Sequence, residues 1–415
     1  MMLAIPNIFR ALASPNYRLY FVGHGLSQIG TWITKTVAIW LIYELTDSPL
    51  MVGIIAFFSL SPTIIFAPVG GLIADRKDRR KILILVQTVA TVRALILAML
   101  AFSNHLSIGA LVLLTAIQAL IEAIDDPTRQ ALIPTLLVNK EYLTNAIALN
   151  SILVSLSRLL GPAIAGILLA YVGAGFCFLA DGLSYLAILS ALLAMRDLQT
   201  NASPLQLRQP WRDIQSGVHY ALQSLPIRTV LLQLAVVNLF ATPIITLGPV
   251  FAERILQGGP EIFGLFVTAS GVGGIFGAIM LSLWSSVRGL DALLTFSPLL
   301  TGVALMGFAQ SRWLNLSLLL IMGVGFLLIL QISASNTILQ TVTEETKRGR
   351  IMSLFVITNG TMLPFGNLLA GVIADWFTAP FALMLEGGLC MASVLFFLPN
   401  FPRLRQAIAQ ASRPH

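Results

Sequence analysis

The feature that most constrains this chain is a series of apolar runs, each about as long as a membrane-spanning helix. Such a helix needs roughly 20 mostly apolar residues to cross the hydrocarbon core of a bilayer. Only helices and closed barrels satisfy their backbone hydrogen bonds in lipid, and these runs are far too long for barrel strands. We expect spanning helices at residues 18–43, 50–74, 82–102, 106–125, 146–172, 176–195, 227–251, 261–285, 290–310, 313–338, 351–374 and 380–399. The sequence therefore predicts an all-α membrane protein with 12 transmembrane helices.

The composition supports this class and argues against others. Of the 415 residues, 57% are hydrophobic and only 10% are charged, whereas soluble domains usually contain about 25% charged residues. The net charge of +7 does not require a nucleic-acid partner, because basic residues concentrate in the cytoplasmic loops of membrane proteins. The two cysteines and four histidines form no CxxC, HExxH or similar ligand pattern, so we expect no metal and no cofactor.

The longest polar stretch, residues 196–226, divides the expected helices into two sets of six. Within it, residues 211–225 have the pattern of a short amphipathic helix that lies on a membrane surface. The chain then consists of an N-terminal segment, a six-helix bundle, a linker with the amphipathic helix, a second six-helix bundle and a tail, at residues 1–17, 18–195, 196–226, 227–399 and 400–415.

Lysine and arginine set the expected orientation. With both termini in the cytoplasm, about 20 of the 25 basic residues fall in cytoplasmic loops or tails or at the cytoplasmic edge of a span. The others are Arg254 and Arg312 on the outside, and Lys35, Arg93 and Arg158 within spans. Because the reverse orientation inverts this bias, the positive-inside rule predicts a multi-pass protein with both ends, and the linker, in the cytoplasm.

The loop between the second and third spans, GLIADRKDRRK at residues 71–81, has a pattern with physical content. Gly71 has no side chain and so lets two helices approach closely. Asp75 can cap a neighbouring helix N-terminus, where the macrodipole favours an anion. Arg79 can pair with an acid on an adjacent span. Three acids end the fourth span on the same side: Glu122, Asp125 and Asp126.

This loop resembles the signature loop of the major facilitator superfamily, with Asp78 in place of the second glycine. Other stretches are similar to the branch of enterobactin-type siderophore exporters and drug exporters: WLIYELTDSPLMVG, DDPTRQALIP, LTNAIALNS, SRLLGPAIAG, NTILQ, RGRIMSLF and PFGNLLAGVIAD. The resemblance covers residues 9–398, nearly the whole chain. It implies the major facilitator fold, in which two six-helix bundles rock about a site at the midplane. It also implies that the signature loop latches the cytoplasmic gate, and we expect gating residues at Gly71, Asp75, Arg76, Arg79, Arg80, Asp125, Asp126 and Arg158.

Polar residues within the first span share one face. His24, Gln28, Thr31 and Lys35 are spaced by four, three and four residues, which places them on one helical stripe. Lys35 lies about two-thirds of the way along the span, and an ionisable residue at such depth indicates a functional site. The alternative for Lys35 is a structural ion pair between helices, and for His24 it is a hydrogen bond without a ligand role.

In the superfamily that the chain resembles, the first, fourth, seventh and tenth spans line the central cavity. The corresponding spans here also carry polar residues, although such side chains equally serve to hold helices together. We expect a substrate pathway formed by His24, Gln28, Thr31, Lys35, Gln118, Asn238, Thr242, Asn336 and Gln340. Arg158, on the fifth span, is interpreted as structural or gate-setting, and it can pair with Glu122 or Asp181.

The source of energy is a second question that the sequence addresses. No Walker A sequence is present, so ATP-driven transport by this chain is disfavoured and an ion gradient is the expected source. A proton carrier must be an ionisable group whose protonation responds to burial and to nearby charge. The candidates are Glu122, Asp181 and Glu386. Antiporters of the superfamily often carry an arginine three residues before a glutamine on the fourth span, whereas this chain has Thr115 before Gln118.

These features predict a secondary active transporter in a bacterial inner membrane. It is expected to act as a monomer, to export a small polar or anionic, siderophore-like molecule by alternating access, and to exchange it for protons. Multidrug or macrolide-type efflux and lysophospholipid transport are alternatives, because one fold hosts many substrates. A membrane-embedded enzyme is a remote alternative, and the sequence has no HExxH, GxSxG or paired catalytic aspartates. We therefore expect no catalytic residues.

Overall fold

The protein is described by a computed structural model that covers residues 7–76, 78–195, 210–242, 244–284 and 289–411. The side chains of residues 7–8, 75–76, 210–214 and 411 lie outside this description. Every regular element in the covered ranges is helical: η1 (Asn7–Ala13), α1 (Pro15–Thr46), α2 (Pro49–Arg76), α3 (Arg79–Phe102), α4 (Ile108–Leu132), η2 (Ile133–Leu136), η3 (Lys140–Tyr142), α5 (Leu143–Val172), α6 (Ala174–Ala194), α7 (Pro210–Gln223), α8 (Leu225–Phe240), α9 (Gly248–Val250), η4 (Phe251–Ile255), α10 (Pro260–Ser282), α11 (Leu290–Gln310), α12 (Leu314–Val342), α13 (Glu345–Trp376), α14 (Ala379–Phe397), η5 (Leu398–Asn400) and α15 (Phe401–Ala411).

Local chemistry explains several helix ends. The carboxylate of Asp78 accepts hydrogen bonds from the backbone N–H groups of Arg80 and Lys81 at 3.0 and 3.3 Å, and so starts α3. Ser107 caps α4 in the same way through Ala110 N–H. These bonds satisfy donors that the first turn of a helix leaves without a partner. Asp47, with a φ of 51°, ends α1 in the left-handed conformation that commonly terminates helices.

The expected number of spans is not reproduced in full. Among the described residues, 10 helices are long and apolar enough to cross a membrane, or up to 11 if the bent pair α7–α8 counts as one span. α1 is 32 residues long, yet it does not pass this test, because its polar stripe lowers its hydropathy. α8 is only 16 residues long, which is short for a span on its own.

The seventh expected span, residues 227–251, is not one continuous helix. α8 ends at Phe240, and the chain resumes helical structure only at α9 and the π-helical turn η4. Pro243, which lies between these helices, is outside the described residues. A proline disfavours helical backbone at the residue before it, and this explains why the apolar run does not continue as one helix.

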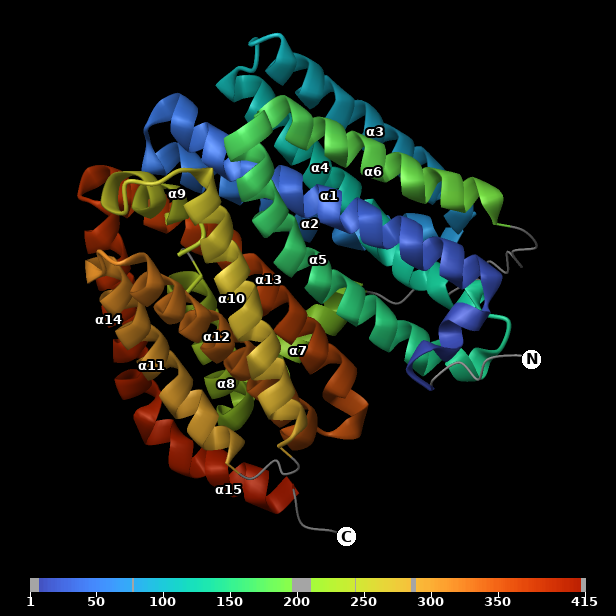
Figure 1. Cartoon of the computed structure of the whole chain (residues 1–415). Coiled ribbons are helices and arrows are strands. Elements are labelled where there is room, and N and C mark those ends of the chain that lie inside the picture. Colours follow the sequence, from blue (N-terminus) through green and yellow to red (C-terminus); the bar gives the residue numbers. More distant parts are fainter. Residues whose placement is uncertain (1–6, 77, 196–209, 243, 285–288, 412–415) are drawn as a thin grey trace. The chain divides into compact units, whose positions relative to one another are not determined.

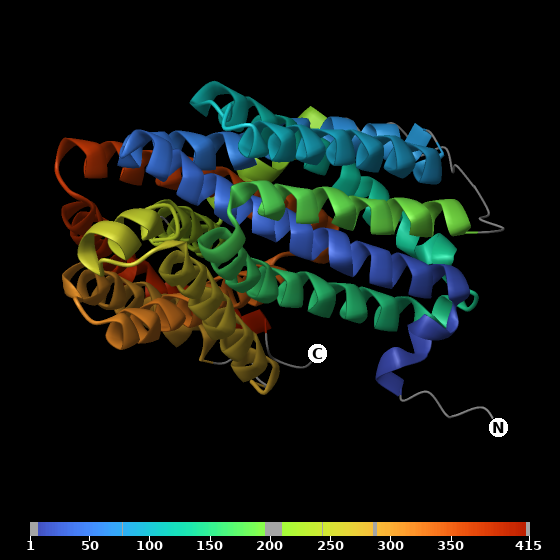
Figure 2. The same ribbon diagram turned by 45° about the horizontal axis from the view of Figure 1, so that its top comes forward.

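The chain divides into two compact units. Unit 1 comprises Met1–Asp47, Phe58–Gln206 and Gly259–Thr268, and therefore α1, most of α2, α3 to α6 and the start of α10. In it, α1 packs against α5 and α6, and α6 packs against α3. Figures 1 and 2 show α1, α5 and α6 side by side in blue and green. A core that includes Tyr17, Tyr20, Leu83 and Tyr185 joins these helices.

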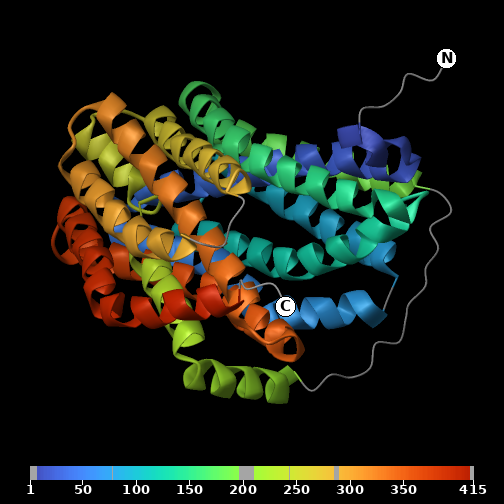
Figure 3. The ribbon, with the colours of Figure 1, turned by 90° about the horizontal axis from the view of Figure 1, so that it is seen from below.

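Unit 2 comprises Ser48–Phe57, Leu207–Gly258 and Ala269–His415. Within it, α11 packs against α12 and α14, and α8 packs against α13. The amphipathic helix expected at 211–225 is present as α7, which contacts α13 and turns into α8 at an angle of 109° (Figure 3). Of the expected linker, residues 196–209 lie outside the described residues.

The end of unit 2 contains a helix that the sequence analysis did not predict. The expected tail at 400–415 forms α15, which is described to Ala411. Its buried residues Phe401, Leu404 and Ile408 belong to the apolar cluster of unit 2, and Arg405 pairs with Asp291 of α11 at 3.3 Å. The spacing of these apolar residues, by three and four positions, is the sequence signal that could have predicted this helix.

Candidate functional site

A ring of hydrogen bonds connects the polar stripe of α1 to α4 and α6. Lys35 Nζ lies 2.8 Å from Glu122 Oε2, and Gln118 Nε2 donates to Glu122 Oε1 at 3.2 Å and to the Tyr185 hydroxyl at 3.1 Å. The Tyr185 hydroxyl lies 2.8 Å from Thr31 Oγ1. The network thus begins and ends on α1 and lies within unit 1.

The direction of this network follows from its donors. Thr31 donates its hydroxyl hydrogen to the carbonyl of Ser27 at 2.9 Å, so its oxygen must accept from Tyr185. Tyr185 in turn accepts from the Gln118 amide. Tyr185 was not among the predicted pathway residues, although it joins two of them.

The Lys35–Glu122 pair differs from the other ion pairs of unit 1 in its access to solvent. The side chains of Lys35 and Glu122 are 25% and 17% exposed. Lys35 also lies 5.5 Å from the centre of the Trp32 ring. Gln28, on the same stripe, is half-buried, and its side chain has no hydrogen bond with another described residue. A partly hydrated cation next to an aromatic ring can bind an anion or a polar molecule.

His24 belongs to a second, fully buried network. Its imidazole faces the guanidinium of Arg129, whose Nη1 lies 3.0 Å from Nε2, and it stacks on the Tyr20 ring. Arg129 pairs with Asp125, which accepts from Gln87 Nε2 at 2.8 Å. Since arginine has only donors, the histidine nitrogen that faces it must accept.

This burial changes the interpretation of two predicted residues. His24 is 1% exposed and Asp125 is 4% exposed, so neither lines an open route in this structure. Arg129, which holds both, was missed. Its position four residues after Asp125 is the spacing of an ion pair along one helix, and this spacing was the available signal.

A third network joins α3, α6 and α1. Arg93 Nη2 lies 2.9 Å from Asp181 Oδ2, and the two side chains are 2% and 0% exposed. The same carboxylate oxygen accepts from Thr34 Oγ1 at 2.7 Å. Asp181 was predicted as a proton-coupling candidate, and the structure places it in this closed contact.

Arg158 does not pair with Glu122 or Asp181 as the sequence analysis allowed, because Lys35 and Arg93 hold these carboxylates. Its guanidinium carbon instead lies 5.6 Å from the centre of the Trp32 ring. It is exposed and forms no ion pair with another described residue.

The signature loop contacts the ends of two helices of unit 1. Arg79 donates to the carbonyl of Ala131 in the last turn of α4 at 3.1 Å. Arg80 donates to the carbonyls of Leu192 and Leu193 in the last turn of α6 at 2.8 and 3.0 Å. Cations favour such ends because the last carbonyls of a helix lack partners.

The remaining gate residues give a mixed result. The side chains of Asp75 and Arg76 lie outside the described residues, so their contacts are not part of this structure. The described acid that caps a helix here is Asp78, the residue that departs from the family pattern. Asp126 is exposed, and Arg79 binds carbonyl oxygens rather than a described acid of α4.

The expectation that Gly71 lets two helices approach closely is wrong. A Cβ atom at Gly71 would have no heavy atom within 4 Å, whereas a Cβ atom at Gly70 would lie 2.0 Å from the carbonyl oxygen of Ala123 on α4. Gly70 is therefore the residue that permits the close approach of α2 and α4. Adjacent positions of a helix face directions about 100° apart, and the sequence alone did not show which of the two glycines faces α4.

The predicted residues of unit 2 bond mainly to neighbours four residues away along the chain. Thr242 donates to the carbonyl of Asn238 at 2.6 Å, and Gln340 donates to Asn336. Asn238 also donates to Asn359 of α13 at 3.1 Å. Glu386 of α14 is fully buried, and neither carboxylate oxygen has a hydrogen-bond partner among the described residues.

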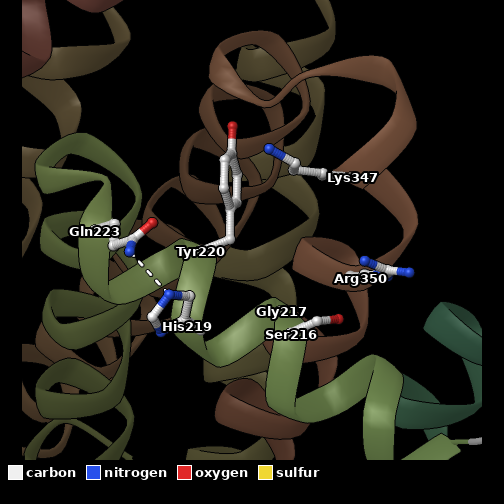
Figure 4. A pocket seen from close by; sticks show the side chains of 7 residues that line it. All are labelled: Ser216, Gly217, His219, Tyr220, Gln223, Lys347 and Arg350. Atoms are coloured by element: carbon white, nitrogen blue, oxygen red, sulfur yellow. Dashed lines mark hydrogen bonds between the residues drawn. The ribbon is translucent and has the colours of Figure 1, made fainter.

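A small cavity of about 190 Å³ lies between α7 and α13. Figure 4 shows His219 and Gln223 hydrogen-bonded on one side, and Lys347 close to the ring of Tyr220, whose centre is 4.2 Å from Nζ. None of the predicted pathway residues lines it. Lys347 also pairs with Glu344 at 3.1 Å, so one of the basic groups that line the cavity is already neutralised.

Comparison with known proteins identifies the family. The model of the family described as transmembrane secretion effector, within the major facilitator superfamily, matches residues 7–415. The chain belongs to this family. It is therefore a multi-pass membrane transporter of the major facilitator superfamily that acts on small molecules, and not an enzyme.

Curated relatives cover nearly its whole length. The transporter is 24% identical to the staphyloferrin A transporter of Staphylococcus aureus, over 94% of this chain and 97% of the relative. It is 23% identical to macrolide efflux protein A of Streptococcus pyogenes, over 91% and 96%. It is 26% identical to the enterobactin exporter EntS of Escherichia coli, over 96% and 95%. Siderophore transporters and a drug exporter thus both belong to its relatives.

Solved structures agree on the fold. A bacterial homologue of the human lysosomal transporter Spinster, in an inward-facing and unoccupied conformation, is similar with a TM-score of 0.68. The match covers 97% of this transporter and 98% of that chain at 14% sequence identity. At this identity the likeness shows the major facilitator fold alone.

Proposed function

We propose that this transporter exports a small anionic or strongly polar molecule of the siderophore type across the inner membrane of a bacterium. The observation that carries the proposal is the Lys35–Glu122 pair. It is 2.8 Å long, lies deep in α1 and α4, and keeps 25% and 17% of its side chains exposed. A charged pair at this depth is costly unless it serves a pathway or is fully sealed, and this one is not sealed. The siderophore transporters among the relatives support the same substrate class.

Transport proceeds by alternating access in this proposal. Two six-helix bundles, at 18–195 and 227–399, rock about the polar stripe, and the linker at 196–226 joins them on the cytoplasmic side. The loop at 71–81 belongs to the cytoplasmic gate. Arg79 and Arg80 fix it to the ends of α4 and α6, so that loop and helices move as one body. Both termini lie in the cytoplasm, and the working unit is one chain.

A proton gradient supplies the energy in this proposal. Of the three candidate carboxylates, Asp181 is enclosed by Arg93 and Thr34 and Glu386 is sealed from solvent. Glu122 is partly exposed and holds its partner through one ion pair. A proton carrier has to meet water on each side in turn, and Glu122 satisfies this condition best.

The test is flux in proteoliposomes that contain the purified transporter and an imposed pH gradient. Staphyloferrin A, enterobactin and a macrolide are the three substrates offered. We expect flux of at least one siderophore. Lys35→Ala should reduce this flux at least about 10-fold, because it removes a charge-assisted contact. Glu122→Gln should abolish the dependence of the flux on the pH gradient.

Lys140→Ala is the matched control, since Lys140 is an exposed lysine in the short helix η3, ahead of the start of α5, and its flux should equal that of the wild type. Siderophore flux that survives Lys35→Ala, together with macrolide flux that falls, contradicts the anion pathway. That result favours drug efflux, to which the similarity with macrolide efflux protein A also points.

A further inference from the structure

Arg158 is a cation at the middle of a long apolar helix, and it has no carboxylate partner among the described residues. It lies halfway along α5 (Leu143–Val172), so its side chain is far from both ends of the helix. A guanidinium at that depth cannot face hydrocarbon without a large free-energy cost. Its exposed side must therefore meet water or a polar ligand.

The neighbouring charges do not neutralise Arg158. Lys35, Arg93 and Arg129 each have a carboxylate partner, in the pairs with Glu122, Asp181 and Asp125. Each of these pairs is balanced one to one. Arg158 also lies within a helix of unit 1, but unlike these three cations it has no carboxylate partner among the described residues.

Polar residues lie on the face of α5 that carries Arg158, beside the exposed apolar residues Ile147 and Val154. Ser151, Ser155 and Arg158 follow one another at intervals of four and three residues and are all exposed, so they form one stripe along the helix. A different exposed stripe of α5 is purely apolar and consists of Ile152, Leu156 and Leu160. The apolar stripe suits lipid, and the polar stripe suits a hydrated route.

The indole ring of Trp32 on α1 reaches Arg158 because α5 has a glycine, Gly161, at the contact between the two helices. Gly161 lies one turn beyond Arg158, and a Cβ atom there would stand 2.4 Å from the Cβ atom of Trp32. The missing side chain lets α1 approach and brings the indole under the guanidinium, with 5.6 Å between Arg158 Cζ and the ring centre. Lys35 reaches the same ring at 5.5 Å. Two cations thus contact one aromatic ring.

We propose that Arg158 and the face of Trp32 form the binding site for the anionic group of the transported molecule. A carboxylate fits best, because the planar guanidinium can donate two parallel hydrogen bonds to it. Stacking on Trp32 orients the guanidinium and leaves its edge free for the ligand. Lys35, which Glu122 partly neutralises, adds attraction at the rim of the site. This inference rests on the proposed export of anionic molecules and reassigns Arg158 from the gate to the substrate site.

The test is equilibrium binding of staphyloferrin A, enterobactin and citrate to the purified full-length transporter in detergent. Triethyl citrate serves as the uncharged counterpart of citrate. We expect Arg158→Gln to weaken binding of the anions that the wild type binds by roughly 10- to 100-fold. Arg158→Lys should restore only part of the affinity, because an ammonium cannot make the paired contact. Gly161→Ala should also weaken binding, since Trp32 has to move away.

Two controls separate binding from folding. Arg312→Gln removes an exposed arginine outside unit 1 and should leave all affinities unchanged. Arg158→Gln should keep the thermal midpoint of the wild type, because no described ion pair is broken. Wild-type affinity in Arg158→Gln overturns the inference and leaves the proposed export intact. If the wild type binds none of the anions, or binds triethyl citrate as well as citrate, both proposals are overturned.

Discussion

The buried ion pair of Arg93 and Asp181 predicts how the free energy of unfolding changes when one or both of these residues are replaced. Both side chains are sealed, at 2% and 0% exposure, and the nitrogen and oxygen lie 2.9 Å apart. Arg93→Met leaves the Asp181 carboxyl group buried, with the Thr34 hydroxyl as its described side-chain hydrogen-bond partner. Asp181→Leu leaves the guanidinium charged and buried without any described acceptor.

The magnitudes follow from the burial. Removing one partner of a sealed ion pair costs about 3–5 kcal/mol, because the other ionisable group is left without that partner in a medium of low polarity. Replacing both partners by apolar residues removes that penalty, so the double variant Arg93→Met/Asp181→Leu should lie within about 2 kcal/mol of the wild type. Thr34→Val removes one hydrogen bond to the carboxylate and should cost about 1–2 kcal/mol.

The assay is unfolding of the purified protein in mixed micelles, followed by tryptophan fluorescence, with the four variants and the wild type measured together. Thr88→Val is the control for the threonine change. Thr88 is exposed on α3 and donates to a carbonyl of its own helix, so its loss should cost less than about 0.5 kcal/mol. The two single variants should both be less stable than the double variant.

One outcome refutes this reasoning. If the losses of the single variants simply add in the double variant, the two charges do not compensate each other. The pair would then contribute as two independent side chains, and the sealed geometry would not be the cause of its stability.

Two further predictions concern the loop between α2 and α3. Gly70→Ala should destabilise the protein by about 1–3 kcal/mol or reduce its yield, because the new methyl group meets the carbonyl of Ala123. Gly71→Ala should be neutral, since no heavy atom lies within 4 Å of a Cβ atom there. Equal thermal midpoints of the two variants would contradict the close approach at Gly70. Asp78→Ala should cost about 1 kcal/mol of stability in the same unfolding assay, through the loss of the α3 cap. Asp78→Asn should retain most of this stability, because asparagine also caps helices. A loss in Asp78→Asn as large as that in Asp78→Ala would argue against capping.

Residue patterns along the chain were sufficient for much of the architecture. The run at 290–310 coincides with α11, and the runs at 82–102 and 176–195 differ from α3 and α6 by a few residues at their starts. Such runs can be read locally because hydrocarbon imposes the same requirement on every span. The α8 region was predicted less well, since Pro243 interrupts an apolar run whose hydropathy alone indicates a continuous helix.

Pairing was less accessible to sequence reasoning. The stripe of His24, Thr31 and Lys35 was predicted from spacing, and its members do contact neighbouring helices. Spacing along α1 could not show that Lys35 reaches Glu122 while His24 reaches Arg129, because these partners lie 87 and 105 residues away. Partner choice depends on how α1 and α4 are rotated against each other.

The polar stripe of α1, the apolar runs and the signature loop are properties of the sequence by itself, because each depends on residues that are near one another along the chain. The tertiary structure decided which charges are neutralised. It sealed Asp181 with Arg93, opened the Lys35–Glu122 pair to solvent and left Arg158 over Trp32 without a described acid. The reason is physical: the free energy of a charge in a membrane protein depends on the atoms within a few ångströms of it, and those atoms belong to helices far apart in the sequence.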